Sequence, residues 1–378
     1  MVIYRKAKPE ERESYIDFAD MVFTTADGVP LSFEASIPKV YGKGVDSAHM
    51  QNIAVDDEKG IRGLIAVMPN VLYVGGETLK TGFVGTVSVH PHARGEGHMK
   101  KLMRMCMDEM LAQGVDLALL NGQRQRYEYF GYVKGGVGYI IDVETRNVRH
   151  ALKDVSTEGV TFEEIDGNSP WREPARRLFE KRIVHFRRDP EQFVDCCRTY
   201  LNHPWAILRD GEFVGYFVSN EKKNFIVETC TVTAADFDAA IKAWMAEFGV
   251  NRMQLMFPEW EQEMLAHLGS YAENIHMQEK VQSCVLNPRR VVSALLRVKA
   301  GYAALADGAM SFDVEGDCFR VTVYNGEVRV EDGGEGALQL SRLEATRLFM
   351  YPFLYEGRPK TPQGWFPLPL YAAAPDEF

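Results

Sequence analysis

Residues 87–99 read VSVHPHARGEGHM, and the interpretation of the whole chain starts from this stretch. The alternation in VSV predicts the end of a strand, and the glycine-bearing segment after Pro91 predicts a loop. A helix follows, because apolar side chains recur there with the spacing of one helical face, at Met99, Leu102, Met103, Cys106 and Met110. Gly114 ends this helix, and VDLALL at 115–120 predicts a second strand.

The loop has the chemistry of an anion site. Free backbone N–H groups at a helix N-terminus attract negative charge. Gly95 and Gly97 would let the backbone approach a phosphate, and Arg94 adds a fixed positive charge. The segment is neither a Walker A loop nor the G-x-G-x-x-G of a dinucleotide fold. It indicates a pyrophosphate site, and the alternative is an ordinary strand–helix turn with a surface arginine.

Composition excludes several classes of protein. The 378 residues carry a net charge of −10 without a dense basic stripe, which argues against general nucleic-acid binding. The start MVIYRKAKPEERES lacks the apolar core of a secretory signal, and no apolar run approaches the roughly 18 residues that span a bilayer. None of the 6 cysteines forms a C-x-x-C pair. We therefore expect a cytoplasmic protein with reduced, mostly buried thiols.

Two changes in composition divide the chain into segments 1–150, 151–286 and 287–378. The first two segments share one plan of a strand pair, further strand pattern, one strong helix and another strand. In the second segment the strand pair is WAILRDGEFVGYFV, in which Asp210-Gly211 supplies the turn. A strand–helix–strand order at this spacing predicts parallel pairing inside a mixed sheet.

The second helix and the third segment carry local signals of their own. Thr233 and Asp236 predict the start of a helix with the same apolar spacing as the first, at Phe237, Ala240, Ile241, Trp244 and Phe248. No Arg-Gly-x-Gly precedes that helix, so we expect no phosphate site in the second segment. In the third segment, Asn325-Gly326 predicts a hairpin and Ser341 the start of a helix.

The histidines near the loop raise the question of a metal site. His90, His92 and His98 flank the phosphate loop, but no cysteine and no helical H-x-x-x-H accompanies them. We therefore expect no metal.

At the loop the chain resembles the GNAT acetyltransferase superfamily, whose pyrophosphate loop has the form R/Q-x-x-G-x-G/A. Here it reads Arg94-Gly95-Glu96-Gly97-His98-Met99, and Met99 departs from the last position. The resemblance implies that backbone groups of Val87 and Val89 hold the pantetheine arm and acetyl group of acetyl-CoA. It also implies that the amides from Arg94 to His98 bind the pyrophosphate, and that Asn121 contacts the same co-substrate.

The pattern YEYFGY at 127–132 and the final Asp-Glu-Phe extend the resemblance to the Eis (enhanced intracellular survival) family. That resemblance implies an α/β (α+β) protein with an active GNAT domain at 1–150, a degenerate GNAT domain at 151–286 and a sterol-carrier-protein-like domain at 287–378. It further implies a homohexamer.

In the family that the chain resembles, a tyrosine is the general acid and the C-terminal carboxylate is the general base. These roles fall here on Tyr127 and Phe378, while Glu377 and Asp27 correspond to acidic contacts of the substrate. The predicted function is acetyl transfer to a primary amine of a cationic small molecule, such as an aminoglycoside or a polyamine, or of a lysine side chain. The alternatives are a lipid- or small-molecule-binding carrier and a CoA-responsive regulator built on the same domains.

Overall fold

The chain folds as two units in a computed structural model that describes all 378 residues. The first unit comprises Met1–Gly136, Lys280–Leu370 and Glu377–Phe378, and the second comprises Val137–Glu279 and Tyr371–Asp376. The chain crosses from one unit to the other inside β6 (Val133–Glu144) and returns inside β13 (Asn274–Val285). The division into three domains made from the sequence stays a prediction.

The first unit contains strands in the order β1-β2-β3-β4-β5-β13. Neighbours pair antiparallel, except that β4 and β5 run parallel, as predicted for the first strand–helix–strand unit. The strand bounds are β1 Val2–Lys6, β2 Gln51–Asp56, β3 Gly60–Val74, β4 Glu77–Val89 and β5 Leu117–Leu120.

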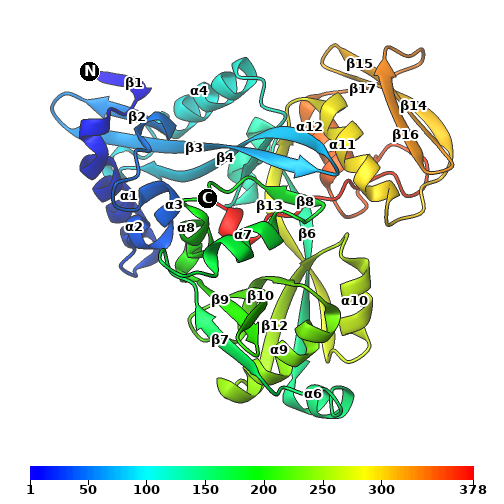
Figure 1. Cartoon of the computed structure of the whole chain (residues 1–378). Helices are drawn as coiled ribbons and strands as arrows, with labels where there is room; N and C mark the ends of the chain where they lie inside the picture. Colours follow the sequence, from blue (N-terminus) through cyan, green and yellow to red (C-terminus); the bar gives the residue numbers. More distant parts are fainter. The chain divides into compact units, whose positions relative to one another are not determined.

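Helices cover this sheet, and α4 contacts β2, β3 and β4 (Figure 1). The apolar stripe predicted for α4 is confirmed, since Leu102, Met103, Cys106 and Met110 are buried. The helix bounds in this part of the chain are α1 Arg12–Asp27, α2 Phe33–Ser36, α3 Pro38–Tyr41, α4 His98–Ala112 and α5 Arg124–Tyr127.

A second sheet in the first unit has the order β16-β15-β14-β17 and packs against α11, as Figure 1 shows in yellow and orange. The predicted hairpin turn is confirmed at Asn325 and Gly326, and Ser341 caps α12 with Glu344. The bounds are α11 Pro288–Ala300, β14 Gly308–Val314, β15 Asp317–Tyr324, β16 Glu327–Asp332, β17 Leu338–Leu340 and α12 Arg342–Met350.

The second unit contains strands in the order β6-β12-β11-β10-β9-β7. The helices and strands of this unit are α6 Thr145–Ala151, β7 Val160–Glu164, α7 Arg172–Phe179, β8 Val184–Phe186, α8 Phe193–Cys197, β9 His203–Arg209, β10 Glu212–Ser219, β11 Phe225–Thr231, α9 Ala234–Glu247, β12 Arg252–Pro258 and α10 Gln262–Gly269.

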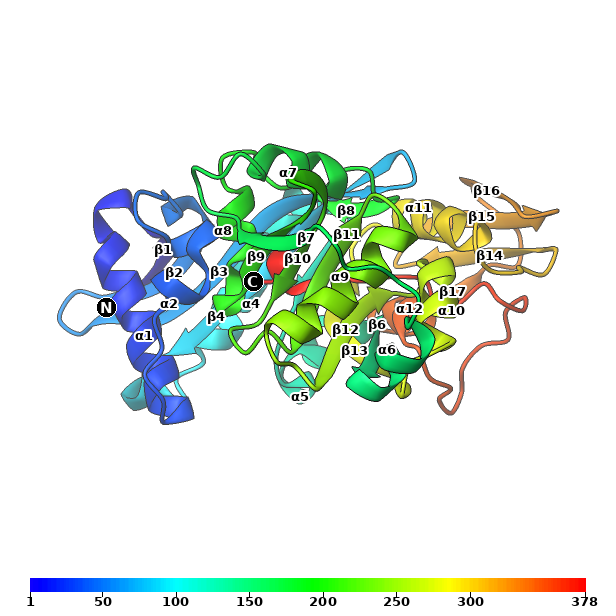
Figure 2. The same ribbon diagram turned by 60° about the horizontal axis from the view of Figure 1, so that its bottom comes forward.

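Alternate residues of β10 point to two different cores of the second unit. Tyr216 and Val218 pack in the cluster of α7, whereas Phe217 packs in the cluster of α9. Because side chains alternate across a strand, α7 and α9 cover opposite faces of this sheet. Figure 2 shows α9 along β10, β11 and β12.

The structure confirms the repeated plan and the predicted fold class. Strands β11 and β12 pair parallel, as β4 and β5 do, and each pair is joined by one long helix. Both units are therefore α/β structures with mixed sheets. No helix combines the length and the apolar composition needed to span a bilayer.

A buried ion network lies beneath α7 in the second unit. The Arg188 guanidinium binds the Glu228 carboxylate at 2.6 Å and the Asp376 carboxylate at 2.8 Å, and Arg188 is 4% exposed. Tyr216 donates a further hydrogen bond to Glu228 at 2.7 Å. Burial opposes ionisation of Glu228, but its interactions with Arg188 and Arg182 lower its pKa overall.

Replacing Arg188 by Met should leave two buried carboxylates without their cation. We expect Arg188→Met to lower the free energy of unfolding by about 3–5 kcal/mol. Urea denaturation followed by circular dichroism measures the change, with the exposed neighbour in Arg187→Met as the matched control. Equal stability of the two variants would contradict the role of Arg188.

Candidate active site

Strands β4 and β5 separate part of the way along their length. They pair only from Thr81–Leu117 to Val84–Leu120, whereas β4 keeps its pairing with β3 as far as Val89. Beyond Val84, the edge of β4 that faced β5 has no strand partner. Its backbone N–H and C=O groups are strong hydrogen-bonding groups, so an extended ligand arm can bind there. Val87 and Val89, predicted to hold the pantetheine arm, lie on this open segment.

A β-bulge accompanies the separation. Leu64 lies opposite Ser88 and Ala66 opposite Gly85, so two residues of β4 face one residue of β3. One of the two, Thr86, has a φ of 51°, and its side chain forms a 2.6 Å hydrogen bond with the Tyr41 hydroxyl. A bulge bends its strand and increases the local twist, which turns the end of β4 away from β5.

The predicted phosphate loop leads directly into α4. Gly95 and Gly97 have φ values of 91° and 82°, in the region that favours glycine, and Gly97 occupies the N-cap without a capping side chain. The N–H groups of Gly95, Gly97 and His98 donate no hydrogen bond within the protein. Together with the exposed Arg94, these groups fit a pyrophosphate.

The side chains of Glu96 and His98 brace the loop. His98 is 4% exposed, and its ring nitrogens contact the Tyr4 hydroxyl at 2.7 Å and the Glu96 carboxylate at 2.9 Å. The hydrogen bond from His98 lowers the pKa of Glu96, with Arg62 adding to the effect. The negative charge of Glu96 therefore faces His98 and Arg62. The sequence predicted only a role of the Glu96 and His98 amides.

Tyr127 lies where the chain leaves β5. It ends α5, is 5% exposed and packs so closely on Gly122 that a Cβ there would lie 2.8 Å from its ring. Burial raises the pKa of its hydroxyl. The hydroxyl forms no hydrogen bond within the protein, so it is free to meet a ligand.

Phe378 lies against β4, the other strand of the opening. It is 5% exposed, and its ring covers Gly85, where a Cβ would lie 2.7 Å from the ring carbons. The ring also lies 6.1 Å from that of Tyr41, between centroids. Gly85 directly follows the last residue of β4 that pairs with β5. The Phe378 carboxylate forms no ion pair within the protein.

Three side chains fix the penultimate residue, Glu377. Asn121 donates to its carboxylate at 2.9 Å, and the Lys280 ammonium lies 3.1 Å from the other carboxylate oxygen in ion-pair geometry rather than hydrogen-bond geometry. Lys39 donates to the Glu377 backbone carbonyl at 2.6 Å. Asn121 directly follows β5, and Phe378 packs on Gly85 of β4. The end of the chain therefore contacts both strands of the opening.

The structure thus brings together most of the predicted site residues within the first unit. Tyr127, Phe378, Glu377 and Asn121 lie at the mouth of the opening, and Val87 and Val89 lie along β4. Asn121 is bonded to Glu377, so its predicted contact with the co-substrate stays a prediction. The predicted substrate contacts of Glu377 and Asp27 also stay predictions, and Asp27 is exposed at the end of α1.

The sequence did not predict three residues near the site, and it left open the reactivity of one nearby cysteine. Lys39, Gly85 and Lys280 belong to no local motif, and only the tertiary structure gives them a role. Burial raises the pKa of the Cys106 thiol in α4 to about 12, so this thiol stays protonated near neutral pH.

The comparisons with known proteins agree with this geometry. Residues 3–135 match the family described as an acetyltransferase (GNAT) domain. No curated protein matches the sequence.

Several solved structures are similar over nearly the whole chain. A probable N-acyltransferase from Enterococcus faecalis is 14% identical with a TM-score of 0.67, and the match covers 92% of this chain and 90% of that one. A GCN5-related N-acetyltransferase from Anabaena variabilis is 16% identical with a TM-score of 0.67, at 93% and 91% coverage. Eis1 from Mycobacterium abscessus is 14% identical with a TM-score of 0.60, at 93% and 89% coverage.

The match at residues 3–135 shows that the protein is an acyltransferase with a GNAT acetyltransferase domain, a class of enzyme that uses an acyl-CoA. Beyond these residues, the chain shares its fold with the solved structures named above.

Gly85→Ala tests the contact between the chain end and β4. The added Cβ would overlap the Phe378 ring, so we expect the last residues to leave their site. Carboxypeptidase digestion followed by mass spectrometry should then release Phe378 at least tenfold faster than from the unaltered protein. Gly167→Ala, which meets open space, is the control. Equal release rates would show that Gly85 does not hold the chain end in place.

Proposed function

We propose that the protein is an acetyl-CoA-dependent N-acetyltransferase of the Eis type, with Tyr127 as general acid and the Phe378 carboxylate as general base. The observation that carries the proposal is the place of the chain end. Phe378 covers Gly85 in β4, and the Glu377 carboxylate accepts a hydrogen bond from Asn121, which directly follows β5. A frayed terminus is the ordinary expectation, so burial and specific bonding of the last two residues support a chemical role.

The open edge of β4 and the loop before α4 would orient acetyl-CoA. Backbone groups of Val87 and Val89 would hold the pantetheine arm and the acetyl carbonyl, and amides from Arg94 to His98, with those of Gly95, Gly97 and His98 free, would bind the pyrophosphate. This arrangement would put the thioester near the separation of β4 and β5, where Tyr127 and Phe378 lie.

The Phe378 carboxylate would activate the acceptor. A primary amine is mostly protonated near neutral pH and must lose a proton before it attacks the thioester carbon. The carboxylate takes that proton, directly or through one water, and the freed lone pair of the amine then forms the new C–N bond. Lys39 and Lys280 hold the adjoining Glu377 in place during this step.

Tyr127 would protonate the leaving group. When the C–S bond breaks, the sulfur leaves with the electron pair and accepts the phenolic proton. A thiol has a pKa near 8.5 and a phenol one near 10, so the transfer is feasible from a positioned tyrosine. Burial keeps Tyr127 protonated, which is the state that an acid needs.

The acceptor we propose is a primary amine of a cationic small molecule, aminoglycoside-like or polyamine, or of a lysine side chain. The net charge of −10 supports long-range attraction of such substrates. Asp27 and Glu377 are proposed to contact the acceptor, and a homohexamer is proposed from the resemblance to Eis proteins.

A thiol-release assay tests the function. Protein and acetyl-CoA are incubated with aminoglycosides, polyamines and lysine peptides, and free CoA is measured. We expect release that depends on at least one of these amines, and mass spectrometry should find an added acetyl group on it. Binding of acetyl-CoA without turnover on any amine would contradict the proposal and favour a CoA-responsive regulator.

Removal of Phe378 should abolish most of the turnover without loss of acetyl-CoA binding. The new terminus at Glu377 would hold its carboxylate one residue short of the site, so we expect kcat to fall by about 10²–10⁴. Phe378→Leu, which keeps a carboxylate at the same position, is the control and should retain more activity than the shortened chain. If the shortened chain keeps the full kcat, another group is the base.

Tyr127→Phe should lower kcat by about 10²–10⁴ with little change in KM for acetyl-CoA. The pH profile gives a second readout. Because burial raises the pKa of Tyr127 above its ordinary 10.0, the acid stays protonated and kcat should not fall through loss of this proton below about pH 10. A variant with unchanged kcat would exclude Tyr127 as the acid.

A further inference from the structure

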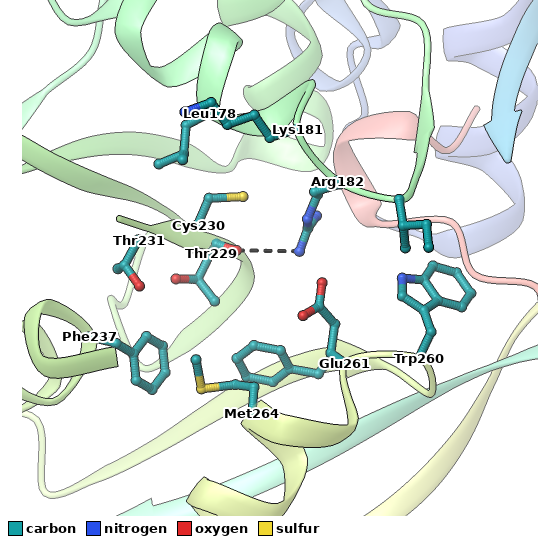
Figure 3. Close-up of a pocket in the computed structure, with 12 residues that line it drawn as sticks. Leu178, Lys181, Arg182, Thr229, Cys230, Thr231, Phe237, Trp260, Glu261 and Met264 are labelled. Carbon is teal, nitrogen blue, oxygen red and sulfur yellow. Dashed lines mark hydrogen bonds between the residues drawn. The ribbon is translucent and has the colours of Figure 1, made fainter. Parts of the chain in front are cut away.

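The second unit contains a cavity of about 350 Å³, which lies in the range of small-molecule sites. Its walls come from the end of α7 and the segment after it, from β11, and from the segment between β12 and α10. Figure 3 shows the lining side chains. All of them belong to the second unit, and no part of the proposed active site lies among them.

This cavity occupies the place that corresponds to the acyl-CoA opening of the first unit. Strands β11 and β12 pair only at Phe225–Gln254 and Ile226–Leu255. Thr229 and Thr231 of β11 and Phe257 of β12 lie beyond that pairing, and all three line the cavity. The second unit thus repeats the separation of two parallel strands.

The repeated opening cannot bind phosphate in the same way. Thr233 caps α9 by accepting the Asp236 amide at 3.1 Å, and the Asp236 carboxylate lies in the first turn of the helix. The capping side chain and the negative charge occupy the helix end that is free in the first unit. A ligand of this cavity must therefore be recognised by other groups.

Two opposite charges face each other in the cavity. Figure 3 shows the Arg182 guanidinium and the Glu261 carboxylate pointing toward one another from opposite walls. No ion pair joins them, and the Glu261 carboxylate has no hydrogen bond or ion pair. Arg182 donates one 3.3 Å hydrogen bond to the Thr229 carbonyl and lies 3.7 Å from Glu228. A guanidinium has five N–H donors, so most of them remain for a ligand.

Further polar groups in the same cavity lack partners. Thr229 is 5% exposed, and its hydroxyl is buried without a hydrogen bond. The indole N–H of Trp260 is also buried without one. Buried polar groups are normally hydrogen-bonded, so both favour a ligand that carries acceptors. The remaining walls are apolar, with Phe237, Phe257 and Met264 among them.

We propose that this cavity binds a small zwitterion, an α-amino acid with an apolar side chain. Its carboxylate would pair with Arg182, its ammonium with Glu261, and its side chain would lie against the apolar wall. A simple cation would be repelled by Arg182, and a simple anion by Glu261. A neutral ligand would leave the Glu261 carboxylate without a partner and most of the Arg182 donors unused, which is unfavourable. The zwitterion satisfies both charges at once.

Isothermal titration calorimetry on the full chain, without acetyl-CoA, tests the site. The probes are L-leucine and L-phenylalanine, with their amides as cations and their N-acetyl derivatives as anions. We expect the free amino acids to bind at least about tenfold more tightly than either capped form, because each capped form loses one charge-assisted contact. Equal affinities of free and capped forms, or no binding of the free amino acids at millimolar concentration, would overturn the proposal.

Two variants locate the site. Glu261→Gln should weaken binding of L-leucine about tenfold and remove the preference over N-acetyl-leucine. Glu263→Gln makes the same charge change on the exposed side of α10 and should leave binding unchanged. An unchanged affinity in Glu261→Gln would place the amino acid elsewhere and overturn the proposal. Acetyl-CoA titrated into the same variants reports on the first unit alone, so failure of this site and failure of the proposed acetyltransferase are distinguishable.

Discussion

The end of pairing between β4 and β5 is the constraint on which the active site depends. After Val84 and Leu120 the two strands separate, and backbone groups that would complete a sheet are left open. A buried edge of this kind is unfavourable unless a ligand or another segment satisfies it. The chain end fills part of the mouth through Phe378 and Glu377, and the remaining edge of β4 is free for an acyl-CoA.

The second unit has the same pair of diverging parallel strands, but the N-terminus of the helix between them is capped by a side chain. Both units place a long helix between two parallel strands that pair briefly and then diverge. In the first unit Gly97 leaves the start of α4 uncapped, whereas Thr233 caps α9 in the second. This one difference removes the anion site. The opening between β11 and β12 persists as a cavity whose polarity comes from side chains rather than from backbone amides.

Local signals in the sequence predicted much of the fold and part of the site. The apolar stripe of α4, the Asn325-Gly326 turn and the Thr233 cap are each determined within a few residues, and the structure confirms all three. The loop before α4 was predictable for the same reason, because Gly95 and Gly97 are adjacent to the helix, while its role as a phosphate site stays a prediction. The fold class followed from the order of these elements.

The rest of the site could not be predicted because it depends on residues distant in the sequence. Lys39 and Lys280 meet Glu377 from positions far along the chain, and neither belongs to a motif. Gly85 is one glycine within a strand, and only the ring of Phe378 explains why a side chain is excluded there. Similarly, Arg182 and Glu261 become a pair of facing charges only when the second unit folds.

The charges around the chain end explain how two neighbouring carboxylates can coexist there. Glu377 and the terminus of Phe378 carry like charges next to each other in a buried place, which is unfavourable unless other charges compensate them. Lys280 lies against the Glu377 carboxylate, and Lys39 binds the carbonyl between the two acidic groups. The Lys280 ammonium therefore pairs with the Glu377 carboxylate, and the Lys39 ammonium adds a second positive charge close to the chain end. Asn121 and Lys280 both engage the Glu377 carboxylate, whereas the terminal carboxylate forms no ion pair, and this difference is what the proposed role of Phe378 as a base requires.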